Sequence, residues 1–575
     1  MSRSSNGSMR STVTAVDSLL LEWQHGRLSR RSVMKRAAAL GLTVPALAAL
    51  VGHAGPGRAA AAVLNAAQDD PASGTPGGTL NVVILGDPPH LDEHQSTAGV
   101  IANVSYCMYE TLFAYDASWQ PIPQLVGEHT ISEDGMVHTM ALRKGVMFHN
   151  DEELKAADAI ASIERWGRIS GVGKNLMAKV TEIVPTDDYT FEIRLSQPYG
   201  TVLIAFSNNT QACVIHPKSV LDAMAAAFPE DAPVTDEQHY IGTGPYKLVE
   251  WQRDSHIRFE RFADYQSAGE TVSGYGGKKY AYADMIEFIP VPDEAARVAG
   301  LQAGDYHVHV PTEIGNDQWD VLNGAPGIVA EILTPTEWDV FFLNWESPMT
   351  GNLAMRQAIQ ASMDHLPILQ SARGGDDFIR LDPSLMMTQT PWHSLAGEEH
   401  YNVNDPELAK AKLQEAGYDG TPLRFMATQE YTFMYGAAIV LKQQLEAVGI
   451  TVDFRVTDWA TVLENRAKKD AWEIFITSHG FVPDPTQISY VGQMNVYPGW
   501  WSSESSLALA ADLASETDFD IRKGIFDQIQ AAAYTEIPSI KVGDASTVSF
   551  RSDQLGGWDP QFERGPKFWN FWLKG

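Results

Sequence analysis

The clearest pattern of apolar and polar positions lies between residues 423 and 477. Residues 423–427 are apolar and strand-like, and residues 434–448 place their apolar side chains on one face of a helix. Residues 452–456 alternate as a strand does, Asp458 can cap a helix through residue 467, and residues 472–477 are a further apolar strand. This β-α-β-α-β series predicts an open sheet with crossover helices.

Two other segments follow the same α/β habit. Residues 79–85 are apolar and predict a buried strand at the start of the ordered chain. Asp405 and Pro406 suit the N-cap and first position of a helix, and Gly417 suits its end. Strand-like and helix-like segments alternate to the end of the chain, which favours the α/β class.

A weakly apolar stretch near the N-terminus, residues 37–51, follows Arg30-Arg31 and Lys35. Paired arginines ahead of a modest apolar segment are typical of a twin-arginine export signal. The stretch is too short to cross a bilayer, which takes about 20 residues. We expect residues 1–61 to be a removable signal peptide, cut after small residues at 59–61, and residues 62–76 to be a linker. The alternative is an ordinary signal behind a chance arginine pair.

The charge balance of the chain is strongly acidic. Its 575 residues carry 42 Lys and Arg against 72 Asp and Glu, a formal charge of −30. Without residues 1–61, 34 basic residues face 70 acidic ones, and the charge becomes −36. Such a surface repels nucleic acid and anionic lipid. The length predicts two or three lobes rather than one core.

Cysteine usage bears on the compartment. Only Cys107 and Cys213 occur, which leaves one disulfide and two buried thiols both open. No cysteine lies in residues 52–62, so we expect a free protein rather than a lipoprotein. A free exported protein is retained by the cell only where an outer membrane encloses it, which predicts a Gram-negative periplasm.

Motifs of catalysis are missing from the sequence. It contains neither a His-Glu-x-x-His zinc motif nor a Gly-x-Ser-x-Gly nucleophile elbow. His307 and His309 alternate along an expected strand, which permits metal binding, although two ordinary strand histidines are the commoner case. No motif in the sequence indicates an enzyme. A secreted hydrolase stays as the alternative from another class of function.

Five blocks follow one another along the chain. They are residues 77–80 with 87–92 and 109–112; 134–149; 242–248; 292–297 with 301–306; and Asn344 with 355–359 and Asp364. In this order they resemble the family 5 solute-binding proteins of ABC importers, the dipeptide-, oligopeptide- and nickel-binding class. The resemblance covers roughly residues 77–575.

The resemblance implies an α/β two-lobed periplasmic binding protein (type II, cluster C-like) with an extra subdomain inserted in lobe I. Lobe I would comprise residues 77–113, 237–335 and 538–575, the inserted subdomain 114–236, and lobe II 336–537. Two chain crossings, near Thr334-Pro335 and Pro538-Ser539, would form the hinge. The implied protein is a monomer without a cofactor. It hands its ligand to a permease and ATPase complex in the inner membrane.

The resemblance also implies where a ligand sits, between the lobes and against a lobe II loop, here residues 478–486. Peptide binders of the family usually place an acidic residue near the start of this loop, where this chain has Gly480, Phe481 and Val482. His479 stands at the usual tryptophan position. Asp484, between two prolines, is expected to shape the turn.

The remaining candidates surround that loop. Tyr497, Trp500 and Trp501 could stack on a ligand or pack at a lobe edge. Further expected pocket members are Trp338, Asn344 and Trp345 from lobe II, and His94, Thr97 and Ala98 from lobe I. The family-block residues Glu110, Arg143, His149 and Asn150 are expected to stabilise lobe I. Arg373 and Arg380 could meet a ligand carboxylate.

The sequence predicts a non-catalytic binding protein and leaves its ligand open. A peptide is the default of the family. Because the loop lacks the acidic residue, a peptide-like or opine-like compound, a sugar derivative and a metal chelate stay as alternatives. The metal alternative depends on His307, His309 and His479.

Overall fold

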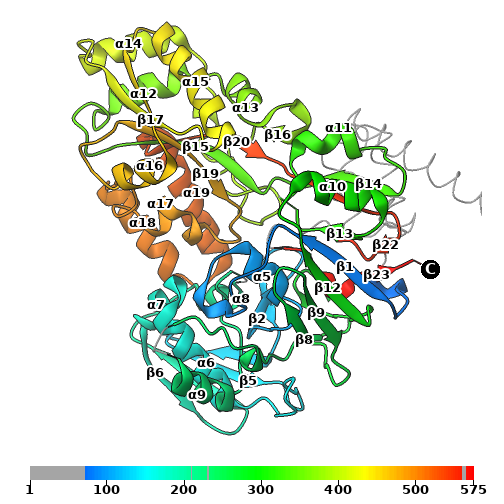
Figure 1. The fold of residues 1–575 in the computed structure, drawn as a ribbon. Coiled ribbons are helices and arrows are strands. Elements are labelled where there is room, and N and C mark those ends of the chain that lie inside the picture. The colour runs from blue at the N-terminus through cyan, green and yellow to red at the C-terminus, as the bar shows by residue number, and fades with distance from the viewer. Residues whose placement is uncertain (1–70, 209, 229–231, 312, 560–564, 575) are drawn as a thin grey trace, which may run out of the picture.

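The computed structural model describes residues 71–575 except 209, 229–231, 312, 560–564 and 575. The expected signal peptide and most of the expected linker therefore lie outside the described residues. Two α/β bodies and a smaller third one make up the rest (Figure 1). Within the described residues, no helix is long and apolar enough to cross a membrane.

Lobe I is built on a seven-stranded mixed sheet in the order β14-β21-β13-β1-β12-β9-β8. β1 pairs in parallel with β12 and β13, and a helix, α10 (Glu294–Ala303), connects those two. The apolar residues of β1 are fully buried, as expected for a central parallel strand. The strands are β1 (Thr79–Ile84), β8 (Tyr246–Gln252), β9 (His256–Arg261), β12 (Met285–Pro290), β13 (Val308–His309), β14 (Ile328–Ile332) and β21 (Val548–Ser552); the other helices are α5 (Gly99–Ser105) and α11 (Trp319–Leu322).

Lobe II is built on a six-stranded sheet in the order β16-β20-β15-β19-β17-β18. The β-α-β-α-β series predicted from residues 423–477 is confirmed: β17 pairs in parallel with β18 and β19, with α15 and α16 as crossovers. The strands are β15 (Glu337–Leu343), β16 (Ile379–Arg380), β17 (Leu423–Ala427), β18 (Val452–Val456), β19 (Ile474–Gly480) and β20 (Ser539–Ala545). The helices are α12 (Leu353–Ser362), α13 (His365–Arg373), α14 (Pro406–Ala416), α15 (Thr432–Ala447), α16 (Trp459–Arg466), α17 (Ser489–Gly492), α18 (Glu504–Ser515) and α19 (Phe519–Glu536).

The helix predicted at Asp405 is α14. The Asp405 carboxylate accepts hydrogen bonds from the backbone N–H groups of Glu407 and Leu408, and Pro406 is the first helical residue. Gly417 ends the helix in the left-handed region at a φ of 69°.

A four-stranded antiparallel sheet forms the third body, which we call the subdomain and define as β4–β7 with α6–α9. Its order is β4-β5-β7-β6, and its apolar face carries a core of its own that includes Phe148, Trp166 and Phe191. The bounds are β4 (Val126–Ile131), β5 (Val137–Leu142), β6 (Val180–Pro185), β7 (Thr190–Leu195), α6 (Ala156–Ile169), α7 (Gly171–Met177), α8 (Val202–Ser207) and α9 (Lys218–Ala227). Three two-stranded sheets complete the fold: β2 (Phe113–Tyr115) with β3 (Pro121–Pro123), β10 (Val272–Ser273) with β11 (Gly276–Gly277), and β22 (Leu555–Gly556) with β23 (Trp572–Leu573).

Two chain crossings connect the lobes side by side. β14 pairs with β21 in lobe I, and their continuations β15 and β20 pair in lobe II, so a two-stranded antiparallel ribbon runs from one sheet into the other. Between the sheets, the Leu333 N–H donates to the Thr547 carbonyl at 2.9 Å and the Thr336 N–H donates to the Ala545 carbonyl at 3.1 Å. We call residues 333–336 and 546–547 the hinge ribbon.

The second crossing differs from the sequence prediction. Thr334-Pro335 lies between β14 and β15, but the return crossing follows Ala545 rather than Pro538-Ser539. β20 hydrogen-bonds to β15, so residues 539–545 belong to the lobe II sheet and not to lobe I. The two cysteines are both buried and free, with Cys107 in the core of lobe I and Cys213 in that of the subdomain.

Candidate functional site

The lobe II loop expected to wall a ligand begins at the end of β19. His479 lies opposite Trp338 in the β15–β19 register, and the two rings stack with centroids 4.9 Å apart and planes 7° apart. The Ser489 N–H donates to Nε2 of His479 at 3.1 Å, so Nδ1 carries the ring proton and donates to the Gly480 carbonyl at 2.8 Å. His479 is therefore neutral, half-buried and held in one orientation, while Gly480 is exposed.

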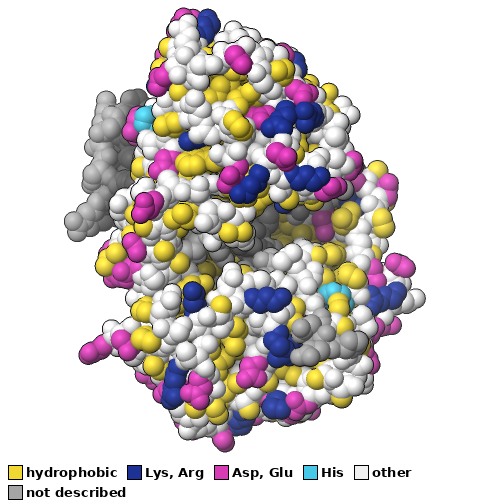
Figure 2. All heavy atoms as spheres, turned by 90° about the vertical axis from the view of Figure 1, so that its left-hand side faces the viewer, with side chains coloured by type: hydrophobic (Ala, Val, Ile, Leu, Met, Phe, Trp, Pro, Cys, Tyr) yellow, Lys and Arg dark blue, Asp and Glu magenta, His cyan; other side chains and the backbone are white. Residues whose placement is uncertain are grey.

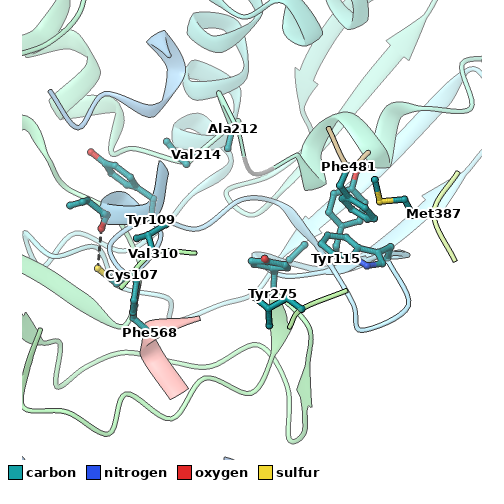
Figure 3. Close-up of a cluster of buried hydrophobic side chains, with 14 of the residues drawn as sticks. Cys107, Tyr109, Tyr115, Ala212, Val214, Tyr275, Val310, Met387, Phe481 and Phe568 are labelled. Atoms are coloured by element: carbon teal, nitrogen blue, oxygen red, sulfur yellow. Dashed lines mark hydrogen bonds between the residues drawn. The ribbon is translucent and has the colours of Figure 1, made fainter. Parts of the chain in front are cut away.

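Phe481 connects this loop to the other side of the molecule. Its ring lies against Trp119, with centroids 4.4 Å apart, and its N–H donates to the Thr336 carbonyl in the hinge ribbon at 2.7 Å. Figure 3 shows Phe481 beside Met387 and close to Tyr115 and Tyr275. One apolar cluster thus includes side chains of both lobes.

Asp484 does not face a ligand with a free carboxylate. The Arg522 guanidinium of α19 donates to both of its oxygens, at 2.9 and 3.0 Å, and the backbone N–H and hydroxyl of Thr486 donate to Oδ1. Both partners of this ion pair are almost fully buried. Asp484 also caps the short helix η7 (Pro485–Gln487), which is the turn-shaping role that the sequence predicted.

A cavity of about 220 Å³ lies beside this ion pair, between lobe II and the segments of β2, β4, β5 and α8. Lobe II supplies Trp392, Pro483, Asp484, Thr517, Phe519 and Arg522; the other wall comprises Tyr115, Trp119, Gln120, Pro121, Ile131, His138, Tyr199, Gly200, Val202, Leu203 and Ile204. The Gly200 N–H donates to the Ala514 carbonyl at 3.0 Å and joins the two walls at one edge. Figure 2 shows the face on which lobe II lies above the subdomain, with a hollow between them.

Among the described residues that line this cavity, His138 is the one histidine. It is buried on β5, and its Nδ1 lies 3.1 Å from Nε2 of His129 on β4. Burial, with a smaller contribution from His129, lowers the pKa of His138 to about 4, so the ring is neutral at neutral pH. Its Nε2 has no hydrogen-bond partner among the described residues.

The aromatic cluster at residues 497–501 lies inside lobe II. Trp500 packs on Trp472 with centroids 5.9 Å apart, the Trp501 indole N–H donates to Glu536 at 2.6 Å, and Tyr497 packs on Phe342. The space that these residues enclose is too small for a water molecule. Of the two alternatives left open by the sequence, these contacts support packing.

Asn344 and Trp345 belong to the same packed region. The Asn344 amide donates to the carbonyls of Lys469 and Trp472, both at 2.8 Å, which leaves it no donor for a ligand. The Trp345 ring is covered by the Arg356 guanidinium at 4.2 Å. Asn344 therefore joins the end of β15 to the segment between α16 and β19, and Trp345 packs on α12.

The lobe I candidates separate into buried and exposed residues. His94 is fully buried, with Nε2 2.9 Å from the Val214 carbonyl and its ring edge-on to His216. Burial holds its pKa well below the usual range. Thr97 and Ala98, just beyond it, are exposed and are not among the residues that line the cavity.

The other charged and histidine candidates are engaged within the protein. Arg373 pairs with Asp339 and Glu337, and Arg380 with Asp544. His307 accepts a hydrogen bond from the Asn81 N–H and His309 one from the Phe550 N–H. In the part of the chain that the structure describes, no three His, Cys, Asp or Glu side chains are grouped to hold a metal ion.

The family-block residues have internal partners as well. Glu110 is buried and accepts from Lys279, Tyr265 and Thr243. Arg143 donates to the carbonyls of Gln124 and Ser267, and His149 contacts the Gly244 carbonyl; Asn150 contacts Glu152 at the surface.

Comparison with known proteins gives the family. The model of bacterial extracellular solute-binding proteins, family 5, matches residues 120–499, about two-thirds of the chain. The chain belongs to this family. Its members are binding proteins, and the family accounts for the two lobes joined by a pair of crossings.

Relatives of this family 5 protein agree over most of its length. A probable peptide ABC transporter periplasmic-binding protein of Sinorhizobium fredii is 26% identical over 504 residues, covering 83% of this chain and 90% of its own. The glutathione-binding protein GsiB of Pectobacterium atrosepticum is 26% identical over 379 residues, 64% of this chain and 67% of its own. The substrate-binding protein CtaP of Listeria monocytogenes has the same fold, with a TM-score of 0.72, 20% identity, and coverage of 87% and 100%.

Sequence reasoning missed the residues that build the cavity of this family 5 protein. Trp119, His138, Trp392 and Arg522 come from four segments of the chain, and of these only His138 lies in one of the five sequence blocks, residues 134–149. These residues share only a bulky or charged side chain, and such side chains occur at many positions in the sequence. Long-range contacts alone bring them together.

Proposed function

We propose that this protein captures a peptide or peptide-like solute between its two lobes and delivers it to the permease and ATPase complex of an ABC importer. It does so as a free monomer in the periplasm, after export by the twin-arginine route and removal of residues 1–61, and it catalyses no reaction. The observation that carries the proposal is a cavity with walls from both sides of a two-stranded hinge.

The hinge ribbon supports a closing motion. The hinge ribbon is one pair of chain segments that passes from one sheet to the other, so a few dihedral angles can reorient one lobe against the other. A solute that contacts both walls stabilises the closed arrangement and shifts the population toward it. The Phe481–Trp119 and Gly200–Ala514 contacts join lobe II to the other side of the molecule in this structure.

The two sheets support a division of the chain into lobes. We assign residues 77–113, 237–335 and 546–575 to lobe I, residues 114–236 to the inserted subdomain, and residues 336–545 to lobe II. The boundary after Ala545 replaces the one expected from the sequence because β20 pairs with β15.

Relatives favour a peptide-like solute over the alternatives. The names of the Sinorhizobium and Pectobacterium proteins specify a peptide and glutathione, and similar folds hold the peptide STSA, agropinic acid and Fe(III)-EDTA. An opine or a sugar derivative would fit a cavity of the same kind. A metal chelate is less supported, since His307, His309 and His479 are each bonded to backbone groups.

Small-angle scattering of the mature protein, residues 62–575, tests the proposal. Titration with a pooled tripeptide library is expected to reduce the radius of gyration and raise the melting temperature together. Pro335→Gly loosens the hinge ribbon and should weaken the apparent affinity with little change in the bound-state radius. An unchanged radius and melting temperature with peptides, opines, sugars and chelates would contradict the proposal.

A further inference from the structure

The cavity between lobe II and the subdomain has a definite chemical character. Its deeper walls are aromatic: Tyr115, Trp119 and Trp392 are each almost fully buried, and Phe519 packs on Trp392 with centroids 4.8 Å apart. Leu203 adds an aliphatic side from α8. Such walls favour a flat apolar group, which can stack on them and leave water.

Among the described residues of its lining, Arg522 and Asp484 form the one ion pair, which carries no net charge. Arg522 and Asp484 satisfy each other through two parallel hydrogen bonds, and the guanidinium lies 5.0 Å over the Trp392 ring. Neither charge is left over for a ligand ammonium or carboxylate. Since an unpaired charge is costly in such surroundings, the cavity disfavours charged groups.

One polar atom in the lining is unsatisfied. His138 is 2% exposed, and its Nε2 has no partner among the described residues. A single proton lies between His129 Nε2 and His138 Nδ1, and its position sets whether the free Nε2 donates or accepts. Nε2 has almost no accessible surface in this structure, so a small side-chain movement must uncover it; the pair can then satisfy a ligand hydroxyl or N–H in either sense, as a buried polar atom requires.

The cavity volume limits the occupant. About 220 Å³ is smaller than the roughly 300–1,000 Å³ of a site for a whole drug-sized ligand. It suits one ring-bearing group of a larger solute. Ile131 and Thr517 are exposed at its lining, so the group can enter from the interlobe hollow.

The geometry points to a specificity subsite between the subdomain and lobe II that takes an uncharged aromatic group of the solute, with its polar tip hydrogen-bonded to Nε2 of His138. This inference rests on the proposed function and deepens it. The closing of the lobes assembles the subsite, because Trp392 and Phe519 come from lobe II while Trp119 and His138 come from the other side. Selection of the aromatic group and closure are thus one event.

Five tripeptides, Ala-X-Ala with X as Ala, Phe, Tyr, Lys or Asp, test the inference by calorimetry on the mature protein. The aromatic peptides are expected to bind about 10–100-fold tighter than Ala-Ala-Ala, as full burial of a ring predicts. Tyr should exceed Phe by about 2–10-fold through its hydrogen bond. The Lys and Asp peptides should bind no tighter than Ala-Ala-Ala.

Two variants locate the effect. Leu203→Trp fills the cavity and should abolish the aromatic preference, whereas the volume-matched control Leu203→Met should keep it. His138→Phe should remove the preference of Tyr over Phe and keep that of Phe over Ala. A purely structural histidine would lower all affinities alike.

The failures are distinguishable. If Ala-Ala-Ala binds as tightly as the aromatic peptides, or if Leu203→Trp keeps their preference, the subsite is wrong while the binding function stands. If no tripeptide binds, the peptide class fails, and p-cresol then tests the subsite by methyl NMR. Shifts at Leu203 and Ile204 in the wild-type protein, with the Ile204 shift abolished by Leu203→Trp, would support it; their absence at millimolar p-cresol would overturn it.

Discussion

The ion pair between Asp484 and Arg522 should hold the binding loop of lobe II in place. Both side chains are nearly fully buried, at 2% and 5% exposure, and the guanidinium also donates from Nε to the Leu513 carbonyl at 3.1 Å. Arg522→Met leaves the Asp484 carboxylate buried without its partner. Removing one partner of a buried pair costs about 3–5 kcal/mol of unfolding free energy.

The size of the thermal effect follows from the size of lobe II. For a unit of about 200 residues, each kcal/mol lowers the melting temperature by about 2–4 °C. Arg522→Met should therefore lower the melting temperature of lobe II by about 6–20 °C, read by calorimetry. Asp484→Asn in the same chain removes the stranded charge but keeps an oxygen for the Thr486 N–H, so the double variant should recover at least half of the loss.

An exposed pair provides the matched control. Arg455 pairs with Asp453 at the surface of β18, and both side chains are more than 40% exposed. Arg455→Met should shift the melting temperature by no more than about 2–4 °C. An equal shift for Arg455→Met and Arg522→Met, or a double variant no more stable than Arg522→Met alone, would refute the reasoning.

The remaining predictions concern pH, packing and export. Burial raises the pKa of Glu93 to about 8 from 4.5, so its contribution to stability is complete below pH 4.5 and is lost as the pH rises toward 8. Glu93→Gln should therefore match the wild-type melting temperature at pH 4.5 and exceed it at pH 8.5. Parallel melting-temperature profiles of the two proteins across this pH range would count against this prediction. Trp500→Phe should lower the melting temperature and leave solute affinity within about 2-fold, whereas His479→Ala should weaken affinity more than stability; calorimetry that gives the reverse order would remove the loop from the site. Replacing Arg30 and Arg31 by Lys should leave the precursor in the cytoplasm on fractionation, and continued export would exclude the twin-arginine route.

Part of the fold could be predicted from local patterns in the sequence. The strands and helices of residues 423–477 were predictable because a hydrophobic period and a helix cap each involve residues that are close in sequence. The same holds for the helix that begins after Asp405. The position of the return crossing could not be predicted in this way. β20 and β21 are separated by only two residues, Ser546 and Thr547, yet pair in different sheets, and that choice depends on partners some 200 residues away.

The candidate site was less predictable than the fold. Trp338, His479 and Phe481 lie together at the interlobe face of β15 and β19. The sequence pointed to them because the family resemblance located the loop. Trp500 and Trp501 are equally aromatic and belong to the same apolar cluster, but they lie inside lobe II, packed on Trp472 and bonded to Glu536. Sequence alone cannot separate aromatic residues that stack on a ligand from those that fill a core.

Native mass spectrometry of the mature protein, purified from the periplasm without denaturation, tests the central claim most directly. The account predicts one discrete added mass per chain, lost on unfolding, from a solute of peptide-like composition. The ring that we expect in this solute would be visible in its fragment spectrum. A bare protein that also gains no thermal stability from peptides, opines, sugars or metal chelates would contradict the account.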